Sequence, residues 1–285
     1  MTVKVTVAAT LPRRFVKMSG AGNDFVMFLG APSGGAEEAA TIRRLCDRRT
    51  GIGADGVLFV RRAGAEIAAD YFNADGAAAR FCANGTRCAA RLAARSLGAG
   101  ETFVVRTGWG PVGARVAPDG RVTISFPEAV RPGRTLSTLS LGGAIAAEAV
   151  EVTVGVPHLV VAVESEEALA SLDLPRLGPP LRHHPEMPEG ANVNFVAQMG
   201  RGSIALRTWE RGVENETLAC GSGTVASAVV ACRAAGEAPP VSARTRSGET
   251  LVVDFKRSGD VFSEISLAGD ARILFEGEIR FEEWP

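Results

Sequence analysis

The sequence predicts an α/β fold built twice, as two related domains in which a sheet surrounds one long helix. Three observations support this prediction. Short β-rich runs alternate with Gly and Asp/Asn turns in both halves, each half holds one long helix candidate, and a cysteine motif occurs twice, 138 residues apart. The two copies read FCANGTRCAA (81–90) and ACGSGTVASA (219–228). Self-similarity at a fixed spacing indicates a repeated structural unit.

The predicted elements are distributed evenly over the two halves. The β-rich runs are 26–30, 56–62, 68–76, 102–108 and 120–127 in the first half, and 149–163, 192–200, 203–212, 249–256 and 262–269 in the second. The helix candidates are 84–97 and 222–235, which are apolar at helical spacing and carry small residues on several faces. Helices of this composition can be enclosed by a sheet.

The repeat extends beyond the cysteines and locates the domains. At the same spacing, Tyr71-Phe72-Asn73 aligns with Trp209-Glu210-Arg211, Gly85 with Gly223, and Thr86 with Thr224. A join in the Pro/Gly-rich stretch 126–134 predicts domains at 1–130 and 131–272, with a C-terminal strand at 273–285 completing the first. The length of 285 residues agrees with two domains. A second Pro-rich stretch, 172–190, is interpreted as a loop.

Composition excludes several classes of function. The net charge is −1 and the arginines are dispersed, whereas nucleic-acid binding needs a clustered basic surface, so no nucleic-acid partner is expected. The N-terminus lacks the layout of an export signal, and no apolar run approaches the ~18 residues of a membrane span. We therefore expect a cytoplasmic protein without a membrane partner. Its five cysteines (46, 82, 88, 220 and 232) are expected as reduced thiols.

Cys82 and Cys220 lie where the two predicted helices start. Unpaired N–H groups and the helix dipole at such a position lower a thiol pKa and favour a bound carboxylate. Two thiols related by duplication suit inversion at a carbon, because a thiolate can remove a proton from one face while a thiol returns one to the other. Two helix starts converging on the carboxylate of an amino acid would stabilise the carbanion.

Other uses of these residues fit the sequence less well. A pyridoxal enzyme needs a suitable lysine, and none of the three lysines has a context that recommends it. No C-x₂-C pair occurs, the spacing typical of a zinc site. The Gly-rich helix starts match neither of the phosphate-binding motifs G-x-x-x-x-G-K-S/T and G-x-G-x-x-G. We therefore expect no cofactor and no metal. Cys46, Cys88 and Cys232 are interpreted as packing residues, and a switchable disulfide between Cys82 and Cys220 stays open as an alternative function.

The chain resembles the diaminopimelate epimerase family essentially from end to end. The segments that carry the resemblance are KMSGAGNDFV (17–26), CDRRTGIGADGVL (46–58), FNADG (72–76), FCANGTRCAAR (81–91), VGVPHLVV (154–161), GANVNFV (190–196) and WERGVENETLACGSGTVA (209–226). The resemblance implies two similar α/β domains, each a mixed sheet around a central helix, with the active site in the cleft between them. It also implies conversion of L,L-diaminopimelate to the meso form, on the route to lysine and peptidoglycan, without cofactor or metal. Members of the family often dimerise, so we expect a homodimer.

The resemblance assigns roles to individual residues. It implies that Cys82 and Cys220 are the acid–base pair and that main-chain groups of Ala83, Asn84, Gly221 and Ser222 hold the reacting carboxylate. It further implies that His158 and Glu210 flank the reacting centre, with Glu210 also contacting an amino group, and that Asn23, Asn73, Asn192 and Arg211 recognise the substrate. The position of His158 after Gly-Val-Pro predicts a loop end, with a core histidine as the alternative.

Three positions depart from the common family pattern. Ala83 stands where Gly is usual, Val156 where Asn often precedes Pro-His, and Gly56 where some members have Gln. These changes leave open a related racemase acting on histidine or proline, although Arg211 and the asparagines favour a substrate with a charged far end. The isomerase of phenazine biosynthesis shares the broad fold but lacks the cysteine pair.

Overall fold

A computed structural model describes residues 11–137, 148–236 and 238–281 of the chain. Contacts divide it into two compact units. Unit 1 holds the described residues up to Ile124 and those from Asp270 onward, and unit 2 runs from Ser125 to Gly269. These limits lie a few residues before the predicted domain boundaries after 130 and 272.

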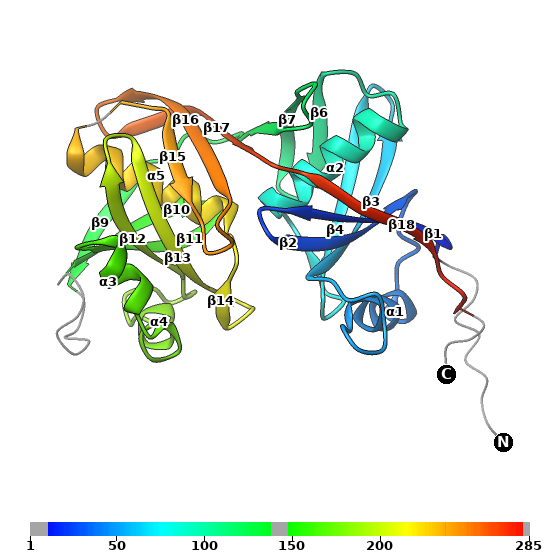
Figure 1. The fold of residues 1–285 in the computed structure, drawn as a ribbon, viewed down its shortest axis with the longest axis horizontal. Helices are drawn as coiled ribbons and strands as arrows, with labels where there is room; N and C mark the ends of the chain where they lie inside the picture. The colour runs from blue at the N-terminus through cyan, green and yellow to red at the C-terminus, as the bar shows by residue number, and fades with distance from the viewer. Residues whose placement is uncertain (1–10, 138–147, 237, 282–285) are drawn as a thin grey trace. The chain divides into compact units, whose positions relative to one another are not determined.

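Unit 1 is a mixed sheet with two helices. Its strands are β1 (Arg14–Gly20), β2 (Asn23–Leu29), β3 (Gly56–Ala63), β4 (Glu66–Asn73), β5 (Ala78–Ala79), β6 (Thr102–Thr107), β7 (Gly110–Val116) and β18 (Arg272–Glu278), and β8 (Val122–Ser125) lies at its limit. Its helices are α1 (Ala36–Cys46) and α2 (Ala83–Ser96). The β2–β3 and β4–β6 pairs are parallel, and the β18–β1, β1–β2, β3–β4, β4–β5 and β6–β7 pairs are antiparallel. Of the described strands, the last, β18, thus lies beside the first, β1, red beside blue in Figure 1.

Unit 2 repeats this arrangement. Its strands are β9 (Pro132–Ser137), β10 (Glu148–Val154), β11 (Val156–Val163), β12 (Asn192–Gly200), β13 (Ser203–Glu210), β14 (Asn215–Thr217), β15 (Val241–Arg244), β16 (Thr250–Ser258) and β17 (Val261–Gly269). Its helices are α3 (Glu166–Ser171), α4 (Leu174–Arg182) and α5 (Gly221–Ala235). The β11–β12 and β13–β15 pairs are parallel, and the β9–β10, β10–β11, β12–β13, β13–β14, β15–β16 and β16–β17 pairs are antiparallel. The order of parallel and antiparallel pairs is therefore the same from β18–β1 to β6–β7 in unit 1 and from β9–β10 to β15–β16 in unit 2, and unit 2 adds the β16–β17 pair.

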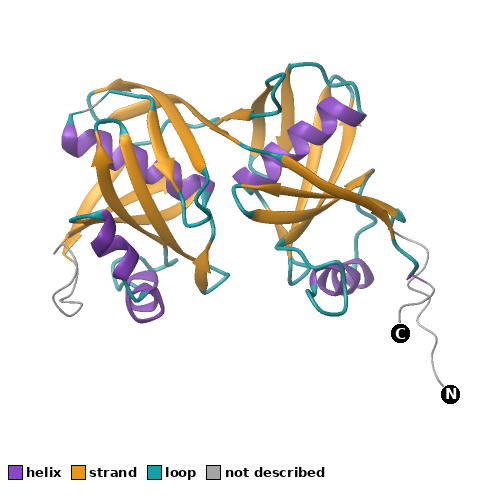
Figure 2. Cartoon of the chain, viewed as in Figure 1, coloured by secondary structure: helices purple, strands orange, loops and turns teal. Residues whose placement is uncertain are grey.

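In each unit the long helix lies inside the strands, as Figure 2 shows. Helix α2 contacts β1, β2, β3, β4, β6 and β7, and α5 contacts β9 to β13 and β15 to β17. Small side chains make this possible, since Ala89, Ala90 and Ala93 of α2 and Ala226 and Ala228 of α5 are fully buried. The predicted fold class, a mixed sheet around a central helix in two similar copies, is confirmed.

Three local predictions were wrong or incomplete. The stretch 172–190 is not simply a loop, because Asp173 caps α4 by accepting a hydrogen bond from the Arg176 N–H (3.4 Å). The run 149–163 is two strands, β10 and β11, separated at Gly155, whose φ of 69° suits glycine. Helices α1 and α3 were not predicted.

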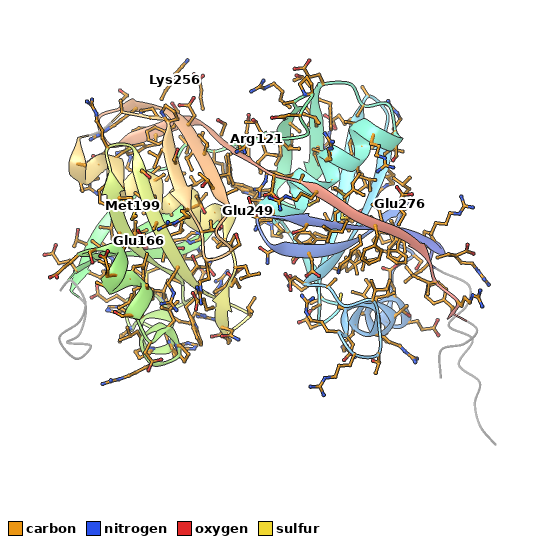
Figure 3. All side chains as sticks on the ribbon, in the orientation of Figure 1. Arg121, Glu166, Met199, Glu249, Lys256 and Glu276 are labelled. Carbon is orange, nitrogen blue, oxygen red and sulfur yellow. The ribbon has the colours of Figure 1, made fainter. Side chains whose placement is uncertain are left out.

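Charged side chains at the surface form local pairs. Three of the residues labelled in Figure 3 are examples: Glu166 pairs with Arg244, Lys256 with Glu264 (2.6 Å), and Glu276 with Arg95 (2.8 Å). Exposed pairs of this kind add little stability. Among the described helices, none is both long and apolar enough to cross a membrane.

Candidate active site

Cys82 is the N-cap residue of α2, as the sequence predicted. Its backbone is extended (φ −141°, ψ 114°), its sulfur accepts a hydrogen bond from the Gly85 N–H (3.4 Å), and its carbonyl accepts one from the Thr86 N–H (2.8 Å). No acidic residue lies in the first turn of α2. The thiol therefore lies at the positive end of the helix dipole, beside the N-terminal N–H groups of Ala83 and Asn84, and the first turn itself carries no acidic side chain.

Cys220 occupies the equivalent place in unit 2. It is the N-cap residue of α5 with an extended backbone (φ −114°, ψ 111°), and its carbonyl accepts a hydrogen bond from the Thr224 N–H (2.8 Å). Its sulfur lies 3.6 Å from the Ser222 hydroxyl, and the first turn, beginning at Gly221, again has no acidic residue. Both helix starts can therefore stabilise a thiolate or a bound carboxylate.

A chain of amides lies beside Cys82. The Asn84 side-chain NH₂ donates to the Asn23 carbonyl oxygen (2.6 Å), and the Asn23 NH₂ donates to Asp55 (3.0 Å). The Arg87 side chain is fully buried. It donates hydrogen bonds to the side-chain oxygen of Asn84 (2.9 Å) and to the main-chain carbonyl oxygen of Asp270 (3.3 Å). The contacts with Asn84 and Asp55 use one lone pair and one hydrogen of the Asn23 amide, and the amide has one more of each.

His158 lies inside β11 and not at a loop end, so that prediction was wrong. It is completely buried, and burial together with the positive charge of Arg211 lowers its pKa to about 3. Its Nδ1 lies 3.2 Å from the side-chain nitrogen of Asn194, and its Nε2 has no hydrogen-bond partner among the described residues. A buried polar atom without a partner costs about 1–3 kcal/mol, which an arriving ligand group can recover.

The remaining predicted residues of unit 2 lie close together at the ends of β12 and β13. The Asn192 side-chain oxygen accepts a hydrogen bond from the Arg211 main-chain N–H (2.7 Å). The Arg211 guanidinium donates to the Glu189 carbonyl (3.1 Å), and the Glu210 carboxylate accepts from the Thr217 hydroxyl (2.8 Å). The turn from β13 to β14 is thereby fixed next to the loop that leads to Cys220.

Asn73 is an exposed residue at the end of β4. Its N–H donates to the Ala77 carbonyl (2.9 Å) and its carbonyl accepts from the Gly76 N–H (2.9 Å), which closes a tight turn. The structure therefore places Asn73 in a turn of unit 1 and leaves its predicted contact with substrate untested.

The other three cysteines are buried. Burial raises the pKa of Cys46 to about 12 and that of Cys88 even further. Cys232 is 1% exposed within α5. Cys46 and Cys88 therefore stay protonated near neutral pH. All three side chains pack as small apolar groups.

Two further polar residues, Arg87 and Asn194, belong to the candidate site although the sequence did not predict them. Both are completely buried and hydrogen-bond to predicted site residues. The available signal was a polar residue inside an apolar segment, in TRCAA and in NVNFV, because such residues need partners in the core.

A model of one protein family matches most of the chain. It is the diaminopimelate epimerase family, and the matched residues are 15–131 and 150–274. The chain belongs to this family. The gap between the two matched segments includes residues 138–147, which lie outside the described part of the chain.

Curated members of the family match at full length. The diaminopimelate epimerases of Aquifex aeolicus and Gemmatimonas aurantiaca are 36% and 37% identical to the chain, covering 94% and 93% of it and 98% of each relative. That of Methanothrix thermoacetophila is 38% identical, covering 95% of the chain and 92% of the relative.

Solved structures at much lower identity share the fold of the epimerase family. A phenazine-biosynthesis PhzC/PhzF protein from Clostridium difficile has a TM-score of 0.71 at 13% identity, covering 95% of this chain and all of that one. A hydroxyproline epimerase from Agrobacterium vitis has a TM-score of 0.66 at 14% identity, covering 93% and 92%. At these identities the similarity shows the fold alone.

Proposed function

We propose that this chain interconverts L,L- and meso-diaminopimelate, with Cys82 and Cys220 as its two acid–base groups. One observation carries the proposal: both cysteines are N-cap residues of the central helices, with the same backbone conformation and the same hydrogen bond to the carbonyl of the cysteine. Two equivalent thiols at two helix starts match a reaction whose forward and reverse directions need the same chemistry on opposite faces of a carbon.

The proposed reaction is a proton exchange at the α-carbon. One cysteine thiolate takes the α-proton, forming an S–H bond as the C–H bond breaks, and the other cysteine thiol gives its proton to the opposite face. The carbanion between these steps is stabilised through its carboxylate by main-chain N–H groups at the helix starts, from Ala83 and Asn84 in one unit and Gly221 and Ser222 in the other. The steps need no cofactor and no metal.

The other site residues are proposed to hold the substrate. Arg211 pairs with the distal carboxylate, for which a guanidinium offers a bidentate contact. Glu210 contacts an amino group, and His158 lies near the reacting centre. Asn23, Asn73 and Asn192 complete recognition through their amides. We further propose that units 1 and 2 act as the two domains that bring these groups to one substrate, and that the enzyme is a cytoplasmic homodimer, to be tested by cell fractionation and sedimentation.

The decisive experiment follows the α-protons in D₂O. Wild-type enzyme with L,L-diaminopimelate is expected to introduce deuterium at one α-carbon as the meso isomer forms, measured by NMR and chiral chromatography. Cys82→Ser and Cys220→Ser should each reduce kcat by about 10²–10⁴-fold, the usual contribution of a general acid or base. Cys232→Ala, a buried thiol of α5 outside the site, is the control and should keep its activity.

The same assay distinguishes the alternatives. If the wild type exchanges no proton of diaminopimelate, the proposal fails, and a panel of amino acids including histidine and proline identifies a racemase of another specificity. If Cys232→Ala loses as much activity as the two serine variants, replacement of a cysteine is enough to damage the fold. The losses in Cys82→Ser and Cys220→Ser would then not support acid–base chemistry.

A further inference from the structure

A small polar cluster lies in the core of unit 2, on three neighbouring strands. His158 is on β11, Asn194 on β12 and Thr208 on β13, directly opposite Asn194 in the strand register. The first two are 0% exposed and Thr208 is 2% exposed. With water this far excluded, the hydrogen bonds among these side chains determine where each proton lies.

The contacts of Asn194 fix the orientation of its amide. The side-chain nitrogen lies 3.2 Å from the main-chain carbonyl oxygen of Leu159, and that oxygen can only accept a hydrogen bond. The group facing Leu159 is therefore the NH₂. The side-chain oxygen of Asn194 accepts a hydrogen bond from the Thr208 hydroxyl (3.0 Å), which agrees with this orientation.

The orientation of the amide determines the protonation of His158. The same NH₂ group lies 3.2 Å from Nδ1 of the imidazole, so Nδ1 must accept with its lone pair. In a neutral imidazole the proton is then on Nε2. This Nε2–H is buried and has no partner among the described residues, so it is a donor that can bind an acceptor group of a ligand.

We propose that Asn194 is a positioning residue that holds His158 as the neutral Nε2–H tautomer, so that His158 acts as a hydrogen-bond donor to an anion and not as a base. The anion is a carboxylate or thiolate that is present at the reacting centre when substrate is bound. The inference rests on the proposed function for its role in catalysis, but the tautomer is a property of the protein alone.

Two further observations support a neutral ring in a fixed place. Arg211 is the charged group that acts on His158, and its positive charge and the burial of the ring both oppose protonation. The first turn of α5 packs directly on the amide: a Cβ at Gly223 would lie 2.2 Å from the Asn194 oxygen. The helix that begins after Cys220 is thus in contact with the residue that orients His158.

The tautomer can be read directly by long-range ¹H–¹⁵N NMR of protein labelled with ¹⁵N-histidine. The chain has only three histidines, and a His183→Gln/His184→Gln variant leaves His158 as the single signal. We expect the Nε2–H pattern, unchanged from pH 5 to pH 9. An Nδ1–H pattern, or titration near pH 6.5, would overturn the proposal.

Two variants test the role of the amide. Asn194→Asp places a carboxylate beside Nδ1 and should move the proton to that nitrogen, with kcat lower by about 10²-fold, as for a misplaced catalytic group, and KM changed much less. Thr208→Val is the matched control, because it removes a hydrogen bond to Asn194 but keeps the contact of the NH₂ with Nδ1, and it should keep the Nε2–H pattern. An unchanged tautomer in Asn194→Asp, or a changed one in Thr208→Val, would contradict the proposal.

Failure of this inference and failure of the proposed function are separable. The NMR experiment is done without substrate, whereas proton exchange from diaminopimelate tests the reaction. An Nε2–H pattern in an enzyme that does not exchange diaminopimelate would keep the tautomer and reject the substrate.

Discussion

The two proposed catalytic thiols differ in the group that faces each sulfur. Cys82 accepts a hydrogen bond from the Gly85 N–H, whereas Cys220 faces the Ser222 hydroxyl. Ser222→Ala removes a hydrogen-bond donor from the Cys220 thiolate only, so alkylation of Cys220 by iodoacetamide should slow by about two- to tenfold, as expected for the loss of one long hydrogen bond. Mass spectrometry of both cysteines checks this, with Cys82 as internal control. Equal slowing at both would contradict the local origin of the effect.

A buried ion pair in unit 1 gives a prediction for stability. Lys17 is 5% exposed and pairs with Asp24 (2.7 Å), which is also bound by Arg48. Burial alone would raise the pKa of Asp24, but the hydrogen bonds and charges of Arg48 and Lys17 lower it below its usual value. Its contribution to stability is therefore complete above the unfolded-state pKa of about 3.9 and is lost as the pH falls through the folded-state value.

We expect Lys17→Met to lower the free energy of unfolding by about 3 kcal/mol at pH 7, because it leaves a largely buried carboxylate with fewer partners. The difference in the free energy of unfolding between Lys17→Met and wild type should become smaller below pH 4, as Asp24 becomes protonated. Urea titration of the two proteins from pH 7 down to pH 2 measures the loss of stability and its decrease with pH. Lys256→Met is the control, since the exposed pair of Lys256 with Glu264 should contribute little. A constant difference down to pH 2 would contradict the linkage.

At the scale of elements, the two central helices differ in how closely their first turns are packed. A Cβ at Gly223 of α5 would lie 2.2 Å from Asn194, whereas at Gly85 of α2 the nearest atoms are the flexible ends of Leu58 at 3.2 Å and 3.3 Å. Gly223→Ala should therefore destabilise the protein by about 1–3 kcal/mol despite its better helix propensity.

Gly85→Ala is the matched variant at the equivalent position and should be nearly neutral. Denaturant midpoints with unchanged slopes measure both changes. Equal losses in the two variants would mean that any side chain at this turn is excluded and that the contact with Asn194 is not the cause.

The sequence predicted the elements whose signals are local and missed those that depend on tertiary contacts. The helices α2 and α5 show continuous small and apolar periodicity, and their starts were predicted to within a residue. Helix α4 contains Pro179 and Pro180, which usually end helices, yet it is held by the Asp173 cap and by Gly178, which packs against the Trp209 ring. That packing cannot be seen in the segment itself.

The same reasoning applies to the site. Cys82 and Cys220 were recognisable because the repeat placed both at helix starts. The burial of His158 and the contacts of Asn194 and Arg87 were not, since they depend on which strands are neighbours and on the register between them.

At the scale of the whole molecule, unit 1 is completed by the end of the chain. β18 pairs with β1, and Phe275 packs edge-on against Phe15 (ring centroids 6.0 Å apart). A chain ending at Gly269 should lose amide protection in β1 and β2 while β12 and β13 of unit 2 keep theirs, measured by hydrogen exchange and mass spectrometry. Loss of protection in both units would show that they unfold together.

The pairing of β1 with β18 also sets an order of events during synthesis. β1 leaves the ribosome before the other described strands, and β18 follows only after all of unit 2, so at about 5–20 residues per second the wait is roughly 10 to 50 s. Throughout that time the outer edge of β1 and the ring of Phe15 lack their native cover, and an open strand edge can pair with another chain. Unit 2 is fully synthesised before unit 1, although its sequence begins later. The speed of translation therefore sets how long the outer edge of β1 stays unpaired.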